Sequence, residues 1–142
     1  ELPKKVSYKL NKNALNYLPA LYQSEIDNNL PAGLLTRMAY QESRFRDDII
    51  FGGPNRAGAV GILQIIPRWH PDVDPTNPYD SIEYAGTFIR RLYDRFGSWD
   101  KALAAYNWGP TNVAKKWQGV EQLPTETRNY VLEIGGDVGL FV

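Results

Sequence analysis

The amino-acid sequence predicts a mainly α-helical fold with little or no β-sheet. Along most of the chain, apolar residues recur at the spacing of one helix face. No sustained alternation of apolar and polar residues supports a sheet of any size. The 142 residues amount to about one ordinary domain, which is long enough to bury a core without disulfides or a structural metal.

Two helices are expected in the N-terminal part, on either side of Pro31. The second covers about residues 32–42, and the first covers about residues 13–28 with a recurring apolar face of Leu15, Leu18, Leu21, Tyr22 and the pair Glu25–Ile26. The glycine-rich segment FGGPNRAGAVG at 51–61 then predicts a loop. The apolar stretch ILQII at 62–66 predicts a short helix that ends at Pro67.

Residues 67–78 hold four prolines in twelve positions, which predicts an ordered surface excursion between helices. A long amphipathic helix is expected over about residues 80–96. Ser98 is placed to cap the next helix, which reaches Tyr106 and ends at Gly109 and Pro110. A last helix begins near Thr125, and the segment GGDVGLFV at 135–142 predicts either a loose or a docked tail. Because no repeat or linker interrupts the chain, residues 1–142 are interpreted as a single globular domain.

Composition excludes several classes of function. Sixteen basic and sixteen acidic residues leave no net charge, which argues against nucleic acid or an anionic membrane as the partner. The absence of cysteine excludes a thiol nucleophile and Cys-based zinc sites. The one histidine, His70, stands in no zinc motif, and Asp72, Asp74 and Asn77 lack the glycine and glutamate of a calcium loop, so we expect no metal and no cofactor. No apolar run approaches the roughly 20 residues of a membrane span, and no signal segment is visible.

Glu42 stands in an unusual place for a carboxylate. The second expected helix has an apolar stripe formed by Leu34, Leu35, Met38 and Ala39. Glu42 continues that stripe near the end of the helix, where burial and the negative end of the helix dipole both oppose its ionisation. A carboxyl that keeps its proton near neutral pH suits a general acid. The alternative is that Glu42 turns to solvent or pairs with Arg44 or Arg46.

Four ordered motifs connect Glu42 to a known family. They are QES at 41–43, GAVGILQIIP at 58–67, ALAAYNWGP at 102–110 and ETRNYV at 126–131. Each is weak alone, but the ordered set resembles the lytic transglycosylases, in their soluble lysozyme-like transglycosylase (SLT) domain, a family related to goose-type lysozyme. The resemblance spans about residues 30–134. It implies a lysozyme-like fold and an enzyme that cleaves peptidoglycan.

The resemblance also implies roles for single residues. Glu42 matches the family's catalytic acid and base, with Ser43 beside it holding the segment near the substrate. Gly58 and Gly61 match glycines that let the backbone approach the sugar. Gln64 matches a glutamine that binds substrate, unless it is an exposed helix position. The chain departs from the family at Leu63, where methionine is usual, at Ile62, where leucine is usual, and at Asn55, near which a small residue such as serine is usual.

The C-terminal motifs imply further substrate contacts. Tyr106 and Asn107 match the tyrosine and asparagine of the family's AYN-x-GP motif, and Tyr130 matches a tyrosine that reaches the catalytic glutamate. Trp108 is unusual for its position and either stacks on a sugar ring or covers the core. Glu126 matches a glutamate of the family's cleft, although an acidic residue in a first helical turn is stabilising wherever it points.

The resemblance implies a reaction that consumes no water. Among the carboxylates only Glu42 matches a catalytic position of the family, and the pair Asp47–Asp48 lies in a polar loop signal and is expected to be solvated. The expected product is therefore a 1,6-anhydromuramyl sugar. The alternatives are a hydrolytic muramidase on the same fold and a non-catalytic module that binds cell-wall glycan. The implied partner is peptidoglycan, met by a monomeric domain in the bacterial periplasm or envelope or on a phage particle, alone or within a larger assembly.

Overall fold

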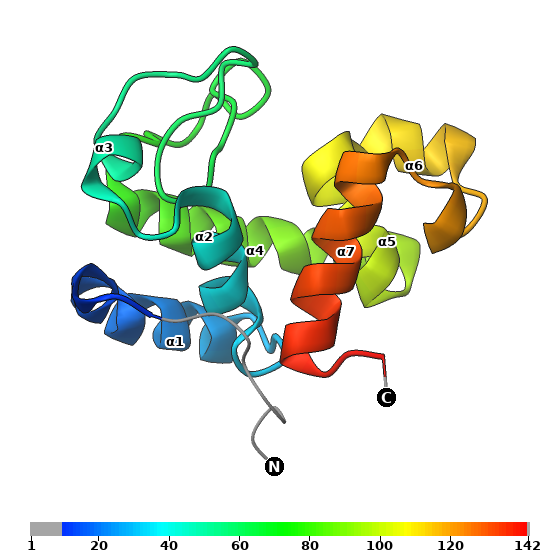
Figure 1. Ribbon diagram of the computed structural model, residues 1–142, viewed down its shortest axis with the longest axis horizontal. Helices are drawn as coiled ribbons and strands as arrows, with labels where there is room; N and C mark the ends of the chain where they lie inside the picture. Colours follow the sequence, from blue (N-terminus) through cyan, green and yellow to red (C-terminus); the bar gives the residue numbers. More distant parts are fainter. Residues whose placement is uncertain (1–9, 142) are drawn as a thin grey trace.

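The computed structural model describes residues 10–141, and helices make up most of this part of the chain (Figure 1). The elements in chain order are η1 Lys12–Asn16, α1 Leu18–Asp27, α2 Leu34–Ser43, α3 Asp47–Ile50, α4 Pro78–Phe96, α5 Trp99–Trp108, α6 Pro110–Lys116, η2 Val120–Gln122 and α7 Thr125–Val138. Between residues 10 and 141 the only extended pairing is one isolated bridge between Val60 and Ile65. The mainly helical fold predicted from the sequence is confirmed.

The helices divide into two groups that face each other (Figure 1). Helices α1, α2 and α4 pack together below two long loops, 51–61 and 67–77, whereas α5, α6 and α7 form the other group. Helix α5 contacts α4, and α7 contacts α2, so both contacts join the groups. Leucine, isoleucine, methionine and alanine side chains from both groups share one buried core.

The predicted first helix differs from the observed one. The chain forms a short 3-10 helix up to Asn16 and then starts α1, with Pro19 in its first turn. The expected apolar face was wrong in part, because Leu15 is 64% exposed and Ile26 is 72% exposed. Of the expected face, Leu21 and Glu25 are buried.

Glu25 is buried because it completes the start of the next helix. Its Oε1 atom accepts a hydrogen bond from the Gly33 N–H at 3.0 Å, and its Oε2 atom accepts one from the Thr36 N–H at 3.0 Å. Gly33 is the N-cap of α2 and has no side chain with which to cap it. A carboxylate also favours the positive end of a helix dipole, so α1 turns a charged residue inward to hold α2.

The short helix expected at 62–66 is absent, and this prediction was wrong. Val60 and Ile65 exchange backbone hydrogen bonds of 2.8 and 3.0 Å, which closes a tight turn through residues 61–64. Gly61 and Gln64 both have positive φ angles, +85° and +49°. A Cβ atom on Gly61 would collide with the Pro75 carbonyl oxygen, so this glycine lets the turn pack against the proline-rich loop.

The later helices agree better with the sequence. Helix α4 spans Pro78–Phe96, and Ser98 caps α5 as expected by accepting a hydrogen bond from the Lys101 N–H. Pro110 does more than end a helix, because it is the first residue of α6, which the sequence analysis did not predict. The short α3 was not predicted either.

The C-terminal segment is docked over the part that the structure describes. Helix α7 continues to Val138, which is buried, and the Phe141 ring packs against the Cα of Gly135. Within the same helix, Asp137 forms an ion pair of 2.7 Å with Arg37 of α2, whose side chain is 5% exposed. None of the helices within residues 10–141 has the length and apolar character needed to cross a membrane.

Candidate active site

The carboxyl group of Glu42 lies where α2 meets α7. Glu42 occupies the last turn of α2 and is half-buried, and Tyr130 projects towards it from the buried face of α7. The Tyr130 hydroxyl donates a hydrogen bond of 2.8 Å to the Glu42 Oε2 atom. The motif resemblance implied this contact.

Burial raises the pKa of Glu42 to about 8. The hydrogen bond from Tyr130 lowers this pKa and the negative charge of Glu126 raises it, but burial has the largest effect. The alternative in which an arginine neutralises Glu42 is wrong. Arg46 pairs with Asp48 at 2.6 Å, and the guanidinium of Arg44 lies 4.3 Å from the centre of the Tyr40 ring. Near neutral pH, Glu42 therefore holds its proton.

A second carboxylate, that of Glu126, is held near Glu42. Glu126 is exposed in the first turn of α7, as the sequence suggested, and it is close enough to raise the pKa of Glu42. The Asn107 side-chain amide donates a hydrogen bond of 3.4 Å to the Glu126 Oε2 atom. The Thr127 hydroxyl in turn donates one of 2.9 Å to the Asn107 Oδ1 atom, which fixes the orientation of the amide.

Gln64 lies in the turn that replaces the predicted helix and is half-buried, so the alternative of an exposed helix position is wrong. Its side-chain amide donates a hydrogen bond of 2.9 Å to the Gly61 carbonyl oxygen, and its Oε1 atom accepts one of 3.1 Å from the Asn55 side-chain amide. These two bonds hold the half-buried side chain in one orientation at the wall of a groove. Gly58 adopts a positive φ in the same segment, and a Cβ atom there would make only an ordinary contact, with the Ile66 side chain.

The Tyr106 hydroxyl bonds to the backbone of the Gln64 turn rather than to the Glu42 carboxyl group. It donates a hydrogen bond of 2.9 Å to the backbone carbonyl of Leu63. The tyrosine thereby joins α5 to the turn that carries Gln64. Burial raises the pKa of Tyr106 well above its ordinary value, and the charge of Glu42 adds to this rise.

Two residues assigned to the substrate side face inward instead. Ser43 is fully buried, where its hydroxyl donates to the Ala39 carbonyl at 3.0 Å and accepts from the Phe45 N–H at 3.2 Å. It therefore stabilises the end of α2 and has no surface for a sugar, which corrects the expected substrate contact. Gly61 is also buried, and its close neighbour is the Pro75 carbonyl oxygen rather than solvent.

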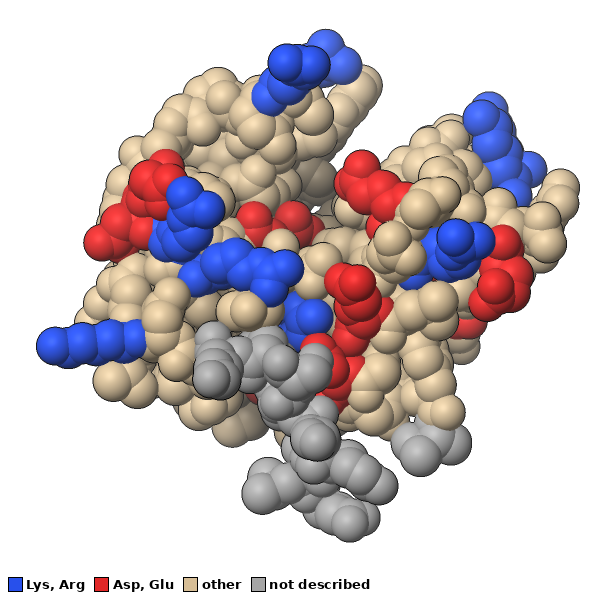
Figure 2. Space-filling model, in the orientation of Figure 1, with Lys and Arg blue, Asp and Glu red and all other residues tan. Residues whose placement is uncertain are grey.

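A groove of about 600 Å³ lies between the two groups of helices and the loops. Its walls include three residues from the loop side, Gln64, Trp69 and His70, two from α4, Tyr84 and Phe88, and three from α5, Tyr106, Asn107 and Trp108. Trp108 packs against the core, and it also lines this groove, where its stacking on a sugar ring stays a prediction. Figure 2 shows the hollow between the two groups, with acidic side chains along its floor and its right-hand side.

Glu42 is not part of the groove wall. Two residues of the groove wall connect Glu42 to the groove. Tyr106 interacts electrostatically with Glu42 directly. Asn107 binds Glu126, whose charge acts on Glu42. The aromatic residues Trp69, Tyr84 and Phe88 were not predicted as site residues. They lie in segments without a motif, so only their contribution to the aromatic content of the chain was visible in the sequence.

The groove carries one histidine. The His70 Nδ1 atom lies 2.6 Å from the Tyr84 hydroxyl, and the His70 ring packs edge-on against Phe88 with the ring centres 4.7 Å apart. Burial lowers the pKa of His70. Within residues 10–141 no group of three or more histidine, aspartate or glutamate side chains is arranged to hold a metal ion.

Comparison with known proteins gives the same family as the motifs. Residues 20–129 match the model of the family described as the transglycosylase SLT domain. The chain is similar in structure to an inactive mutant of the lytic transglycosylase Slt from Pseudomonas aeruginosa, with 20% sequence identity and a TM-score of 0.67. It is also similar to the 70 kDa soluble lytic transglycosylase from Escherichia coli, with 23% identity and a TM-score of 0.70.

These two structural matches cover 84% and 87% of this chain but only 23% and 24% of the other chains. The chain therefore spans about a quarter of the length of each solved protein. The likeness confirms the predicted lysozyme-like transglycosylase fold.

Proposed function

The chain belongs to the transglycosylase SLT domain family, and on that ground we propose that it is a peptidoglycan lytic transglycosylase. Its substrate is the β-1,4 bond between N-acetylmuramic acid and N-acetylglucosamine. The observation that carries this proposal is the Glu42 carboxyl, which keeps its proton near neutral pH and is oriented by Tyr130. One of the similar solved proteins is inactive as a variant with a single glutamate replaced by glutamine, which is in keeping with a single essential acid.

In the proposed reaction Glu42 first acts as the acid. It donates its proton to the glycosidic oxygen as the bond between that oxygen and C1 of the muramyl ring breaks, and N-acetylglucosamine leaves with a free hydroxyl. The acetamido oxygen of the substrate stabilises the positive charge at C1. The Tyr130 hydroxyl, which donates to Glu42, stabilises the carboxylate that forms.

Glu42 then acts as the base. Its carboxylate takes the proton of the muramyl 6-hydroxyl, and the 6-oxygen forms a bond to C1. The 1,6-anhydro ring closes, Glu42 regains its proton and no water is consumed. Gln64, Tyr106, Asn107 and Glu126 are proposed to orient the sugars around this centre, since Gln64, Tyr106 and Asn107 line the groove and Asn107 binds Glu126.

A hydrolytic muramidase is the second candidate, and one observation favours it. Glu126 is an ionisable neighbour of Glu42, and a second carboxylate is what a hydrolytic enzyme uses to activate water or to form a covalent intermediate. Glu126 is exposed and its carboxylate is held by Asn107. In the first proposal its charge instead serves to keep Glu42 protonated.

Mass spectrometry of digested peptidoglycan tests both candidates. Purified sacculi incubated with the protein should release muropeptides that are lighter by one water than the hydrolytic products. Glu42→Gln should abolish release, whereas Glu121→Gln, which changes an exposed glutamate in η2, should not. Hydrolytic masses from the wild-type protein would establish the muramidase, and release by the Glu42→Gln variant would refute both mechanisms.

The remaining features of the proposal follow from the substrate. Residues 1–142 are proposed to act as one transglycosylase domain, because the described helices share one core. Its place of action is the bacterial cell envelope, where peptidoglycan lies, and the reaction as written needs no metal or cofactor.

A further inference from the structure

Trp69 is a large apolar side chain that the fold leaves in solvent. It is 64% exposed and lies on the wall of the groove, at the edge formed by the 67–77 loop. Its backbone is nevertheless fixed, because the Trp69 N–H donates to the Ile66 carbonyl at 3.0 Å and the His70 N–H donates to the Pro67 carbonyl at 3.1 Å. An exposed indole on a fixed backbone beside a groove is pre-organised to stack on a ligand ring.

His70 anchors this loop to the helix below. Its contacts with Tyr84 and Phe88 of α4 hold the residue next to Trp69 against the groove wall. The backbone that carries the indole is therefore ordered by the fold before a ligand arrives, which reduces the conformational freedom lost on binding.

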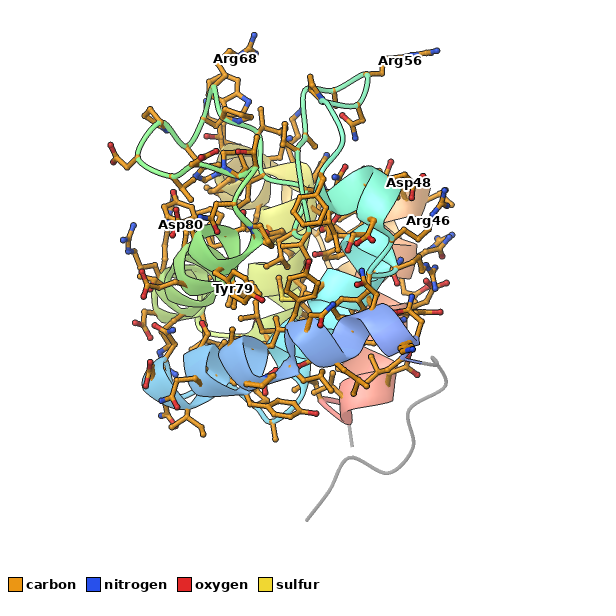
Figure 3. All side chains as sticks on the ribbon, turned by 90° about the vertical axis from the view of Figure 1, so that its left-hand side faces the viewer. Arg46, Asp48, Arg56, Arg68, Tyr79 and Asp80 are labelled. Atoms are coloured by element: carbon orange, nitrogen blue, oxygen red, sulfur yellow. The ribbon has the colours of Figure 1, made fainter. Side chains whose placement is uncertain are left out.

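Arg68 adds a positive charge to the same edge. Its guanidinium lies 4.5 Å from the centre of the Trp69 ring, in a cation–π contact. Arg68 forms no ion pair with any residue in the range 10–141. Figure 3 shows Arg68 at the tip of its loop, pointing away from the core, and Figure 2 shows basic side chains on this upper tip above the acidic hollow.

We propose that Arg68 and Trp69 form a subsite for the carboxylate-bearing sugar of the glycan strand. The face of a sugar ring carries C–H groups that stack on the indole, and a carboxylate on that sugar pairs with the adjacent guanidinium. In a peptidoglycan strand that sugar is N-acetylmuramic acid, whose lactyl group is a free carboxylate wherever no stem peptide is attached to it. The inference takes its substrate class from the proposed function and assigns to this edge the recognition of muramyl units over neutral ones.

The subsite lies away from the reacting atoms. Trp69 lines the groove, whereas Glu42 does not, so Arg68 and Trp69 select and hold the strand without taking part in the proton transfers. They are specificity-determining residues rather than catalytic ones. Changes at these positions should therefore alter KM and leave kcat close to the wild-type value.

Two tetrasaccharides test the subsite. The first alternates N-acetylglucosamine with N-acetylmuramic acid that carries a free lactyl carboxylate, and the second is chitotetraose, which is neutral. Binding is measured by calorimetry in a Glu42→Gln background so that neither sugar is cleaved. Arg68→Gln should weaken binding of the muramyl tetrasaccharide about fivefold and leave chitotetraose binding unchanged. Trp69→Ala should weaken both about tenfold or more, and Trp69→Phe should retain most of the affinity.

Matched controls come from the neighbouring loop, 51–61. Arg56 is an exposed loop-tip arginine outside the groove wall, and Phe51 is a similarly exposed aromatic residue that lines a different hollow. Arg56→Gln and Phe51→Ala should leave the binding of both sugars unchanged. The proposal is overturned if Arg68→Gln weakens both sugars equally or neither, or if Trp69→Ala has no effect.

These outcomes are independent of the proposed function. If the wild-type protein releases no anhydro product but Arg68→Gln still affects only the muramyl sugar, the reaction fails and the subsite stands. If anhydro product forms and the two variants bind as the parent does, the subsite fails and the function stands.

Discussion

Replacing Glu42 with glutamine should remove a large part of the pH dependence of stability. In the folded protein the pKa of Glu42 is raised to about 8, whereas the ordinary value, which applies in the unfolded chain, is 4.5. Between these values the folded state keeps the proton and the unfolded state loses it. Stability that is fully present below the lower pKa is therefore lost as the pH rises towards the higher one.

The size of this effect follows from the width of the window. Each pH unit within it lowers the wild-type free energy of unfolding by about 1.4 kcal/mol, which amounts to about 4 kcal/mol between about pH 5 and pH 8. Glutamine is neutral throughout, and its side-chain oxygen can still accept the hydrogen bond from Tyr130. The stability of the variant relative to the wild type should thus grow with pH and level off above about pH 8.

Urea unfolding followed by tryptophan fluorescence, at a series of pH values, measures this difference directly. Other titrating groups are present in both proteins and cancel in the comparison. The Glu121→Gln variant is the control, since an exposed glutamate should give a difference that is nearly constant over the same pH range. A constant difference between the Glu42→Gln variant and the wild type would show that burial does not raise the pKa of Glu42 and would refute the argument.

Three further outcomes are expected. Tyr130→Phe removes a hydrogen bond that lowers the pKa of Glu42, so the basic limb of the kcat/KM–pH profile should move to higher pH. The value of kcat should fall by about one to two orders of magnitude, and an unchanged profile would exclude the contact. Glu126→Gln removes a charge that raises the pKa of Glu42, so the basic limb should move to lower pH. A shift to higher pH would contradict this. Arg37→Met removes a buried guanidinium that pairs with the half-buried Asp137 and should cost about 3 kcal/mol in urea unfolding, against less than about 1 kcal/mol for Arg46→Met at an exposed pair. Equal costs would contradict the importance of burial.

Strong local signals in the sequence were sufficient for several elements. Helix α4 has a long amphipathic repeat, and α5 begins at a serine cap, so short-range spacing alone determines both. The raised pKa of Glu42 was predictable for the same reason, because the apolar stripe of α2 places this residue at the buried side.

Errors arose where contacts distant in sequence decide the local structure. The stretch 62–66 is apolar enough for a helix, but Gly61 packs against the backbone of Pro75, and the Tyr106 hydroxyl takes the Leu63 carbonyl. Neither contact leaves a mark in the spacing of residues 62–66. In the same way, the spacing of residues 13–28 did not show that Ile26 is exposed. The neighbouring Glu25 turns inward because it caps α2, which lies further along the chain. A motif thus located Tyr106 near the site but could not identify its hydrogen-bond partner.

Keeping the Glu42 carboxyl group protonated at the end of α2 lowers the stability of the fold, and other contacts of α2 offset this loss. Above the ordinary pKa of a glutamate, the raised pKa of Glu42 lowers the stability of the fold. The same helix is held at its start by Glu25 and on its flank by the buried pair between Arg37 and Asp137. That pair joins α2 to α7, the helix that carries Tyr130, so it restrains the relative position of the acid and its hydrogen-bond donor. Charged groups that are paired or capping therefore keep in place the Glu42 carboxyl group, whose pKa burial raises.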